Sequence, residues 1–120
     1  MSDTKYNLQK RLVKFSALII TSIKSLKKEF ASEHLTKQLI RSATSAALNY
    51  GEAQSAESKR DFIHKMKICL KELRESQVNI EILLAANLVN EIEEFEKVLK
   101  ENSELVAIFT SSIKTTQRKM

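Results

Sequence analysis

Apolar side chains recur at intervals of three or four residues along almost the whole chain, and this spacing constrains the fold more than any other feature. Such a repeat places the apolar side chains on one face of an α-helix. The runs predict helices over about residues 5–30, 33–53, 58–88 and 91–117. The first run includes Phe30 as its last member. The chain has no proline and a single glycine, Gly51, so it lacks the turn residues that strand-rich folds need. We therefore expect an all-α protein.

Only a few residues separate consecutive helical runs. Short connections between long helices place neighbouring helices side by side in opposite directions. No internal repeat and no linker divides the chain, so we expect a single domain over residues 1–120. Ser32, Ser58 and Asn90 precede the second, third and fourth runs and are predicted N-caps. The predicted architecture is an antiparallel up-down-up-down four-helix bundle.

The segment from Ser42 to Ser58 is built mainly from small side chains and contains the glycine. Some of its side chains point into the predicted bundle. Others point nearly the opposite way and, with Ile40 just before the segment, form a predicted second packed face. Its members, at spacings of four, three and four residues, are Ile40, Thr44, Ala47 and Gly51. A glycine within a helix costs about 1 kcal/mol relative to alanine, which is easier to explain if another backbone packs against it. We therefore predict a subunit interface on this face. The alternative is that Gly51 marks the helix end and residues 51–57 form a loop.

Positive charge is concentrated near the N-terminus. The net charge is +5, and residues 1–30 hold seven basic and two acidic side chains. The predicted nucleic-acid-binding surface on the first helix consists of Lys10, Arg11, Lys14, Lys24, Lys27 and Lys28. Such side chains bind phosphates without reading sequence, and the scarcity of aromatic side chains on this face argues against recognition of specific single-stranded bases. Two alternatives remain open. The face is merely solvated and the protein is a protein–protein scaffold, or the basic surface is on the third helix, at Lys67, Lys71 and Arg74.

The chain offers little for catalysis or metal binding. Its two histidines, His34 and His64, fall on different predicted helices and have no partner at metal-ligand spacing. The single cysteine, Cys69, lies on the apolar face of the third run, where a buried thiol is expected. Glu72 and Glu75 lack the Glu-x-x-His pattern of carboxylate-bridged metal bundles. We expect a protein that is not an enzyme and uses no metal or cofactor.

The apolar stretch from Phe15 to Ile23 follows basic residues, as the core of an export signal would. It is shorter than the roughly 20 apolar residues that cross a bilayer, and no small-residue cleavage site follows it. We expect a cytoplasmic protein with no membrane segment.

The run from Ile40 to Ala86 resembles a bacterial four-helix-bundle family, the 23S ribosomal RNA intervening-sequence proteins. The pattern is an arginine, an Ala/Ser-rich helix, Asn-x-x-Glu, a serine, a phenylalanine, and a leucine-containing helix with a Lys-Glu-x-x-Glu segment. In this chain it is formed by Arg41, Asn49, Glu52, Ser58, Phe62, Lys71, Glu72 and Glu75. Many members have a second arginine where this chain has Ser42, and Gly51 stands one place earlier than the family's glycine.

The resemblance implies a four-helix protomer assembled into a homopentamer. It also implies likeness to the accessory protein of diversity-generating retroelements, a basic pentameric bundle that works with a reverse transcriptase and nucleic acid. The partners to expect are therefore further copies of the chain, RNA or DNA, and a reverse transcriptase or another protein. Arg41, Asn49 and Glu52 are a predicted polar motif, which either fixes helix register as a buried hydrogen-bond network or contacts a ligand.

Overall fold

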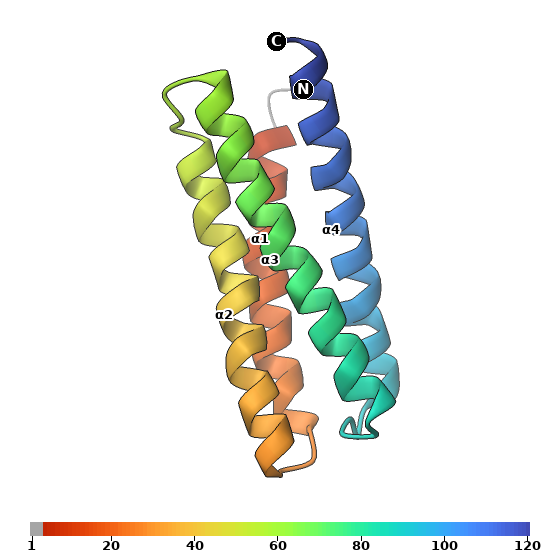
Figure 1. Ribbon diagram of the computed structural model, residues 1–120. Helices are drawn as coiled ribbons and strands as arrows, with labels where there is room; N and C mark the ends of the chain where they lie inside the picture. The colour runs from red at the N-terminus through yellow and green to blue at the C-terminus, as the bar shows by residue number, and fades with distance from the viewer. Residues whose placement is uncertain (1–3) are drawn as a thin grey trace.

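The computed structural model describes residues 4–120, which form four α-helices and one short 3₁₀-helix. The α-helices are α1 (Thr4–Ser22), α2 (Phe30–Ala53), α3 (Lys59–Ala85) and α4 (Ile92–Arg118), and the 3₁₀-helix η1 (Ile23–Ser25) follows α1. Consecutive α-helices run in opposite directions, and the α1–α2 and α3–α4 connections lie at the same end of the bundle (Figure 1). The prediction of an all-α chain with four helices is confirmed. Residues 1–3 of the predicted domain lie outside the described residues.

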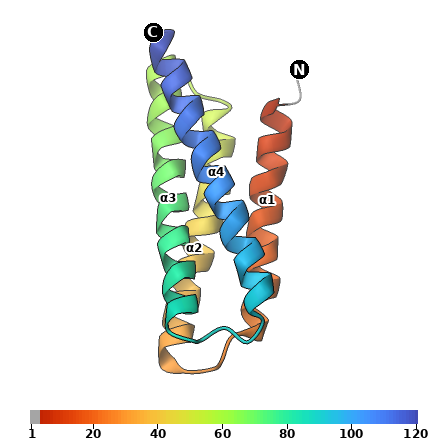
Figure 2. The same ribbon diagram turned by 90° about the vertical axis from the view of Figure 1, so that its right-hand side faces the viewer.

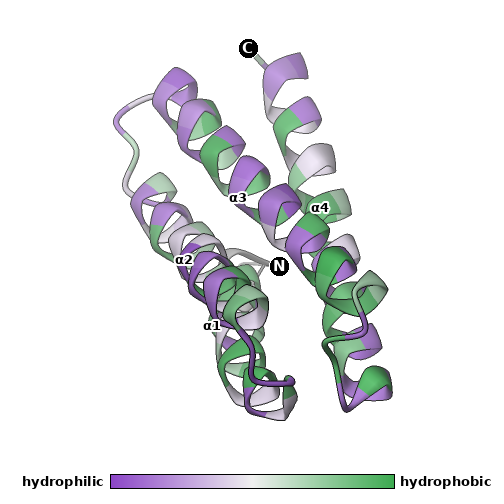
Figure 3. Ribbon diagram, turned by 60° about the horizontal axis from the view of Figure 1, so that its bottom comes forward, coloured by the Kyte–Doolittle hydropathy of each residue, from purple (hydrophilic) through white to green (hydrophobic). Residues whose placement is uncertain are grey.

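The α-helices enclose one apolar core. Phe15, Phe95 and Phe109 expose at most 1% of their surface. The ring of Tyr50 on α2 meets Phe109 on α4 edge-on, with ring centroids 5.7 Å apart. Apolar positions gather on the inner faces of the helices (Figure 3). α1 and α3 stand on opposite sides of the bundle with α2 and α4 between them (Figure 2).

The first helix is shorter than predicted. α1 ends at Ser22, and after η1 the chain is extended at Leu26, which pairs with Val89 in an isolated antiparallel bridge. The amide of Lys27 donates to the carbonyl oxygen of Leu88 at 2.9 Å. The apolar spacing of the first run continues through this segment. However, pairing with the other connection, rather than a continued helix, satisfies part of its backbone.

The prediction that Phe30 lies on the buried face of the first helix is wrong. Phe30 is the first residue of α2, and 85% of its surface is exposed. Glu29 is the N-cap of α2, and its amide donates to the Oγ of Ser32 at 3.0 Å within a capping box. Ser32, the predicted N-cap, therefore stands three residues inside the cap. This box fixes the start of α2 and leaves the Phe30 ring at the end of the bundle.

The predicted N-caps of the last two helices have different outcomes. Ser58 is the N-cap of α3, and its Oγ accepts a hydrogen bond from the amide of Asp61 at 3.0 Å, as predicted. Asn90 is not the N-cap of α4, because that position is occupied by Glu91.

α3 ends at Ala85, before the predicted residue 88, because Asn87 takes a left-handed conformation with φ of 60°. The amide of Leu88 then donates to the carbonyl oxygen of Leu83 at 3.1 Å. Asparagine tolerates this conformation better than most residues, and the hydrogen-bond pattern is a common way to end a helix.

The small-residue segment is helical, and α2 continues through Gly51, so the alternative of a loop starting there is wrong. On one side of α2, the Oγ of Ser42 lies 2.7 Å from the Oγ of Ser76 on α3. On another side, Ser16 on α1 donates to the carbonyl oxygen of Ala43 at 3.2 Å. Small side chains therefore let α1 and α3 both approach α2 closely.

The face predicted as a subunit interface is partly covered by the same chain. Gln9 on α1 donates to the carbonyl oxygen of Ala47 at 3.2 Å, and a Cβ added at Gly51 would lie 3.5 Å from the Oε1 of Gln9. Ile40 and Thr44 are half-buried. Since successive helical residues are about 100° apart, this face lies about 110° from the core-facing side chains and not opposite them. A second packed face on α2 therefore does not by itself require a neighbouring subunit.

Candidate functional site

The structure divides the predicted cationic surface of the first helix. Arg11 on α1 donates to Glu101 on α4 at 2.7 and 3.0 Å and to Glu104 at 3.1 Å. The hydrogen bond to Glu101 is the main cause that raises the pKa of Arg11. Arg11 thus joins α1 to α4, and its charge is neutralised there. Lys10 and Lys14 are exposed on α1.

Lys24, Lys27 and Lys28 are not on the first α-helix as predicted, but in η1 and in the connection to α2. All three side chains are exposed, and they line a shallow cavity of 250 Å³ together with Glu33. This connection forms one end of the bundle (Figure 1). The lysines therefore stay together, although about three helical turns separate them from Lys14.

The outer face of α2 continues this basic segment and carries two aromatic rings. The ring of Phe30 stacks on that of His34, with centroids 6.3 Å apart and planes at 11°. Lys37 follows one turn later, and the side chains of Lys28, His34 and Lys37 are exposed like that of Phe30. We call Lys28, Phe30, His34 and Lys37 the stacking face.

Sequence reasoning missed the stacking face because it assigned Phe30 to the first helix. A signal was present: Glu29 stands three residues before Ser32, which is a capping box with the acidic and hydroxyl residues exchanged. Because the usual order places the hydroxyl residue first, the pattern was not recognised as the start of a helix.

The predicted polar motif is divided between two groups of contacts. Arg41 on α2 donates to Glu72 on α3 at 3.3 and 3.4 Å and to Glu75 at 3.0 Å. The charge of Glu72 is the main cause that raises the pKa of Arg41. The side chain of Glu72 is only 11% exposed, whereas that of Arg41 is 57% exposed. The pair therefore connects a buried carboxylate to the surface.

Asn49 joins this network through a serine. It donates to the carbonyl oxygen and the Oγ of Ser45 at 2.9 and 3.1 Å, and Ser45 donates to Glu72 at 3.4 Å. Glu52 instead accepts from Lys65 at 2.7 Å and lies outside the network. For Arg41 and Asn49 the arrangement favours the structural interpretation, a set of hydrogen bonds that fixes α2 against α3.

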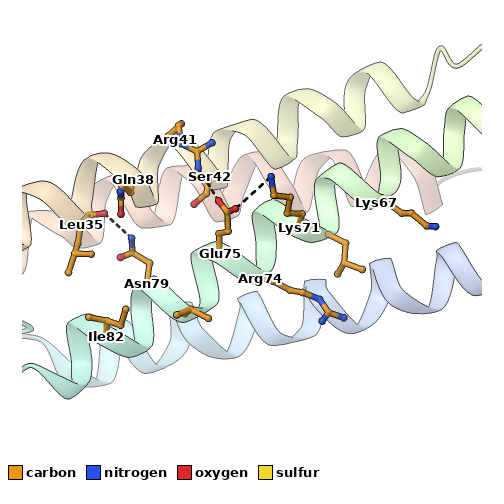
Figure 4. Close-up of a pocket in the computed structure, with 12 residues that line it drawn as sticks. Leu35, Gln38, Arg41, Ser42, Lys67, Lys71, Arg74, Glu75, Asn79 and Ile82 are labelled. Carbon is orange, nitrogen blue, oxygen red and sulfur yellow. Dashed lines mark hydrogen bonds and ion pairs between the residues drawn. The ribbon is translucent and has the colours of Figure 1, made fainter.

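A groove of 760 Å³ runs along the outer side of α3 beside α2 (Figure 4). Its apolar lining is Leu35 from α2 and Leu70, Val78 and Ile82 from α3. Its charged lining is Arg41, Lys67, Lys71, Arg74 and Glu75. The basic residues of the third helix, a sequence-based alternative, therefore surround an apolar floor. We call this surface the α3 groove.

Asn79 is one of the polar residues that line the groove, with Gln38 and Ser42. Its amide nitrogen donates to the carbonyl oxygen of Leu35 at 3.0 Å (Figure 4). Its Oδ1 is buried and accepts no hydrogen bond from the described residues. A buried acceptor without a partner costs about 1–3 kcal/mol.

The groups considered for catalysis lie apart. Cys69 is buried against α2, its thiol lies 3.5 Å from the carbonyl oxygen of Ala46, and burial raises its pKa to about 12. His34 belongs to the stacking face, and His64 is exposed on α3. Within residues 4–120, no three His, Cys, Asp or Glu side chains come together as metal ligands would. None of the helices in this part of the chain has the length and apolar character to cross a membrane.

Comparisons with known proteins agree with this fold. A crystal structure of a protein of unknown function from the S23 ribosomal protein family of Bacteroides thetaiotaomicron VPI-5482 is 32% identical to this chain, with a TM-score of 0.79. The similarity covers 89% of this chain and 98% of that one. No curated protein matches. Residues 4–111 match the protein family described as "23S rRNA-intervening sequence protein". The family expected from the central segment therefore extends over nearly the whole chain, which belongs to the 23S rRNA-intervening sequence protein family.

Proposed function

We propose that the chain binds single-stranded nucleic acid through the stacking face, with Lys24 and Lys27 as further phosphate ligands. The observation that carries this proposal is the exposed ring of Phe30, 85% of whose surface is accessible at the end of the bundle. Every base has a π-face, so an exposed ring binds single-stranded bases with little sequence preference. Duplex bases are already stacked on one another and cannot use the ring in this way.

Charge near Phe30 suits a phosphate backbone. Lys24, Lys27 and Lys28 lie within six residues before it, and Lys37 follows on the same face of α2. The side chain of Glu29 is held by the capping box, where it accepts from the backbone of α2. Glu33 reduces the local positive charge, so stacking has to supply part of the affinity. Backbone contacts alone would give no preference for the single strand, because the duplex has the higher charge density.

The test compares single-stranded RNA, single-stranded DNA and duplex DNA of one sequence by fluorescence anisotropy. We expect the single strands to bind more tightly than the duplex. We also expect the logarithm of the binding constant to fall with the logarithm of the salt concentration, with a slope of about −0.7 for each phosphate neutralised on a single strand. Equal binding of duplex and single strand would remove the role of the ring. No binding at low salt would end the proposal.

We also propose that the chain has no catalytic activity. The thiol of Cys69 is buried and its raised pKa keeps it protonated at neutral pH, which makes it a poor nucleophile. Neither histidine lies beside this thiol. Turnover of any substrate that is lost in a Cys69→Ser or His64→Ala variant would contradict this proposal.

Assembly into a homopentamer remains a proposal, supported by the family resemblance. Light scattering of the wild-type chain is the direct test, with an expected mass of about five times the protomer mass of 13.7 kDa. A monomer at roughly tens of micromolar, where an interface of standard size is populated, would contradict it. Ala47→Glu is a poor probe, because Ala47 packs within the same chain.

A further inference from the structure

The outer side of α3 beside α2, which forms the α3 groove, is unusually apolar for an exposed surface. Val78 and Ile82 are one helical turn apart and expose 53% and 46% of their surface. Leu70 and Leu35 extend the same apolar floor within the groove. From Leu70 to Ile82 the floor is about 18 Å long at 1.5 Å per residue. An elongated apolar strip of this length suits another helix better than a compact small molecule.

The charges around the floor have one predominant sign. Arg41, Lys67, Lys71 and Arg74 line the groove, and Glu75 is the one carboxylate among its lining residues. Glu75 is itself engaged by Arg41 at 3.0 Å and by Lys71 at 4.0 Å (Figure 4). Lys67 and Arg74 are exposed and form no ion pair within residues 8–120. Two cations are therefore available to an occupant.

We infer that the α3 groove is a docking site for an acidic amphipathic helix of a partner protein. Apolar side chains of that helix at i, i+3, i+4 and i+7 would cover Val78 and Ile82. Glutamate or aspartate on its flanks would pair with Lys67 and Arg74.

The floor argues against nucleic acid as the occupant. The groove lining includes aliphatic side chains and cations but no aromatic ring. Aliphatic side chains give bases no stacking partner. Charged phosphates gain nothing from contact with an apolar surface. Charge complementarity together with apolar burial therefore favours an acidic helix over an RNA or DNA strand.

The experiment uses the full-length chain and two labelled synthetic helical peptides of about 18 residues, long enough to span the groove. Both carry leucine at i, i+3, i+4 and i+7. One has glutamate at the flanking positions and the other has lysine there. We expect anisotropy to show the glutamate peptide bound at least about tenfold more tightly than the lysine peptide.

Two variants with the same number of reversed charges provide a matched comparison. Lys67→Glu/Arg74→Glu should lose the glutamate peptide and gain affinity for the lysine peptide, while single-stranded RNA still binds. Lys24→Glu/Lys28→Glu should keep the glutamate peptide. Val78→Ser/Ile82→Ser, which keeps every charge, should weaken the glutamate peptide by about tenfold or more, since two apolar anchors lose their contacts.

Three results would overturn the inference. The first is equal binding of both peptides. The second is loss of RNA with retention of the glutamate peptide in Lys67→Glu/Arg74→Glu, which would make the groove a nucleic-acid surface. The third is no binding of either peptide together with a change of oligomeric mass in Val78→Ser/Ile82→Ser, which would mean that a second copy of this chain covers the groove. Because RNA and peptide are measured separately, failure of the nucleic-acid proposal leaves the groove result interpretable.

Discussion

The stacking face on α2 and the α3 groove both combine cations with exposed apolar side chains, yet the two surfaces suit different ligands. On α2, the ring of Phe30 stands clear of the bundle, stacked on His34. On α3, Val78 and Ile82 form part of a floor with cations at its edges. An isolated ring with lysines around it suits bases and phosphates, whereas an aliphatic strip with cations on its rim suits an acidic helix.

The comparison shows that net positive charge alone does not identify a ligand. With Lys24 and Lys27 counted beside the stacking face, each surface has four lysine or arginine side chains. What lies between those charges decides which partner gains from binding. Arg41 stands between the two surfaces, as it lines the groove from α2 and is engaged by Glu72 and Glu75 of α3.

Cys69 supplies the largest expected effect and a control for every surface variant. Its thiol is buried and its pKa is raised to about 12, so labelling by a thiol reagent near pH 8 should be on the order of a thousandfold slower than in denaturant. A surface variant that keeps this protection has lost a contact and not its fold. Rapid labelling of the native chain would show that Cys69 is accessible.

The same thiol predicts a loss of stability at high pH. The folded pKa of about 12 lies above the unfolded value of 9.0, so between these values the unfolded chain releases a proton that the folded chain keeps. The free energy of unfolding should therefore fall as pH rises from about 9 towards 12, by at most about 1.4 kcal/mol for each pH unit. Tyr50, whose pKa is raised mainly by burial, acts in the same direction. Urea titrations of wild type and Cys69→Ser measure how the difference in the free energy of unfolding changes with pH, and this difference should be constant below pH 8.

Phe30→Ala is the next largest expected effect and tests the stacking face. The loss of one stacked base should weaken single-stranded RNA about tenfold to a hundredfold. Binding of the glutamate peptide to the α3 groove should not change. The matched control is Leu48→Ala, which removes a side chain that is 70% exposed on the same helix. If both alanine variants weaken RNA equally, the effect belongs to general surface apolarity and the comparison fails.

Arg41→Gln tests the residue that stands between the surfaces. Because its guanidinium group holds Glu75 at the groove edge, the substitution should free a carboxylate there and weaken the glutamate peptide about threefold to tenfold. RNA should change by less than about twofold, since Glu72 and Glu75 already engage this charge in the wild type. Isothermal titration calorimetry with each ligand measures the loss of affinity for the peptide and for RNA, and the two losses can then be compared. A larger loss for RNA than for the peptide would place Arg41 on the nucleic-acid surface.

Gly51→Ala is the smallest expected effect. Its new methyl group would meet Gln9 at an ordinary contact distance of 3.5 Å, so we expect a gain in the free energy of unfolding of about 0.5–1 kcal/mol from helix propensity. Neither RNA nor peptide binding should change. Thermal denaturation and light scattering check this together. A change of oligomeric mass would instead place Gly51 at a subunit seam.

Helix periodicity predicted most of the fold, because one shared core requires the apolar side chains of each helix to lie on a single face. The end of α1 could not be predicted in this way. Leu26 keeps the helical spacing, but its backbone pairs with Val89, a contact between residues far apart in the sequence. The exchanged capping box at Glu29 then moved Phe30 from a predicted core position to the surface.

The binding surfaces were predictable only in part for the same reason. Sequence reasoning identified the lysines of the connection and, as an alternative, those of α3. It could not show that Arg11 is neutralised, because Glu101 lies 90 residues further along the chain. Nor could it show that Val78 and Ile82 are exposed together with Lys67, since that depends on where α2 and α4 pack.

The bridge between Leu26 and Val89 makes the two ends of the bundle unequal in their tolerance of added sequence. At that end, the amides of Lys27 and Asn90 donate hydrogen bonds between the α1–α2 and α3–α4 connections. An insertion in either connection would therefore pull the two connections apart. At the opposite end, the amides of Ser55 and Ala56 bond only to the last turn of α2. An inserted loop, an epitope or a fused domain would therefore be accommodated between α2 and α3, away from the stacking face and without opening the bundle.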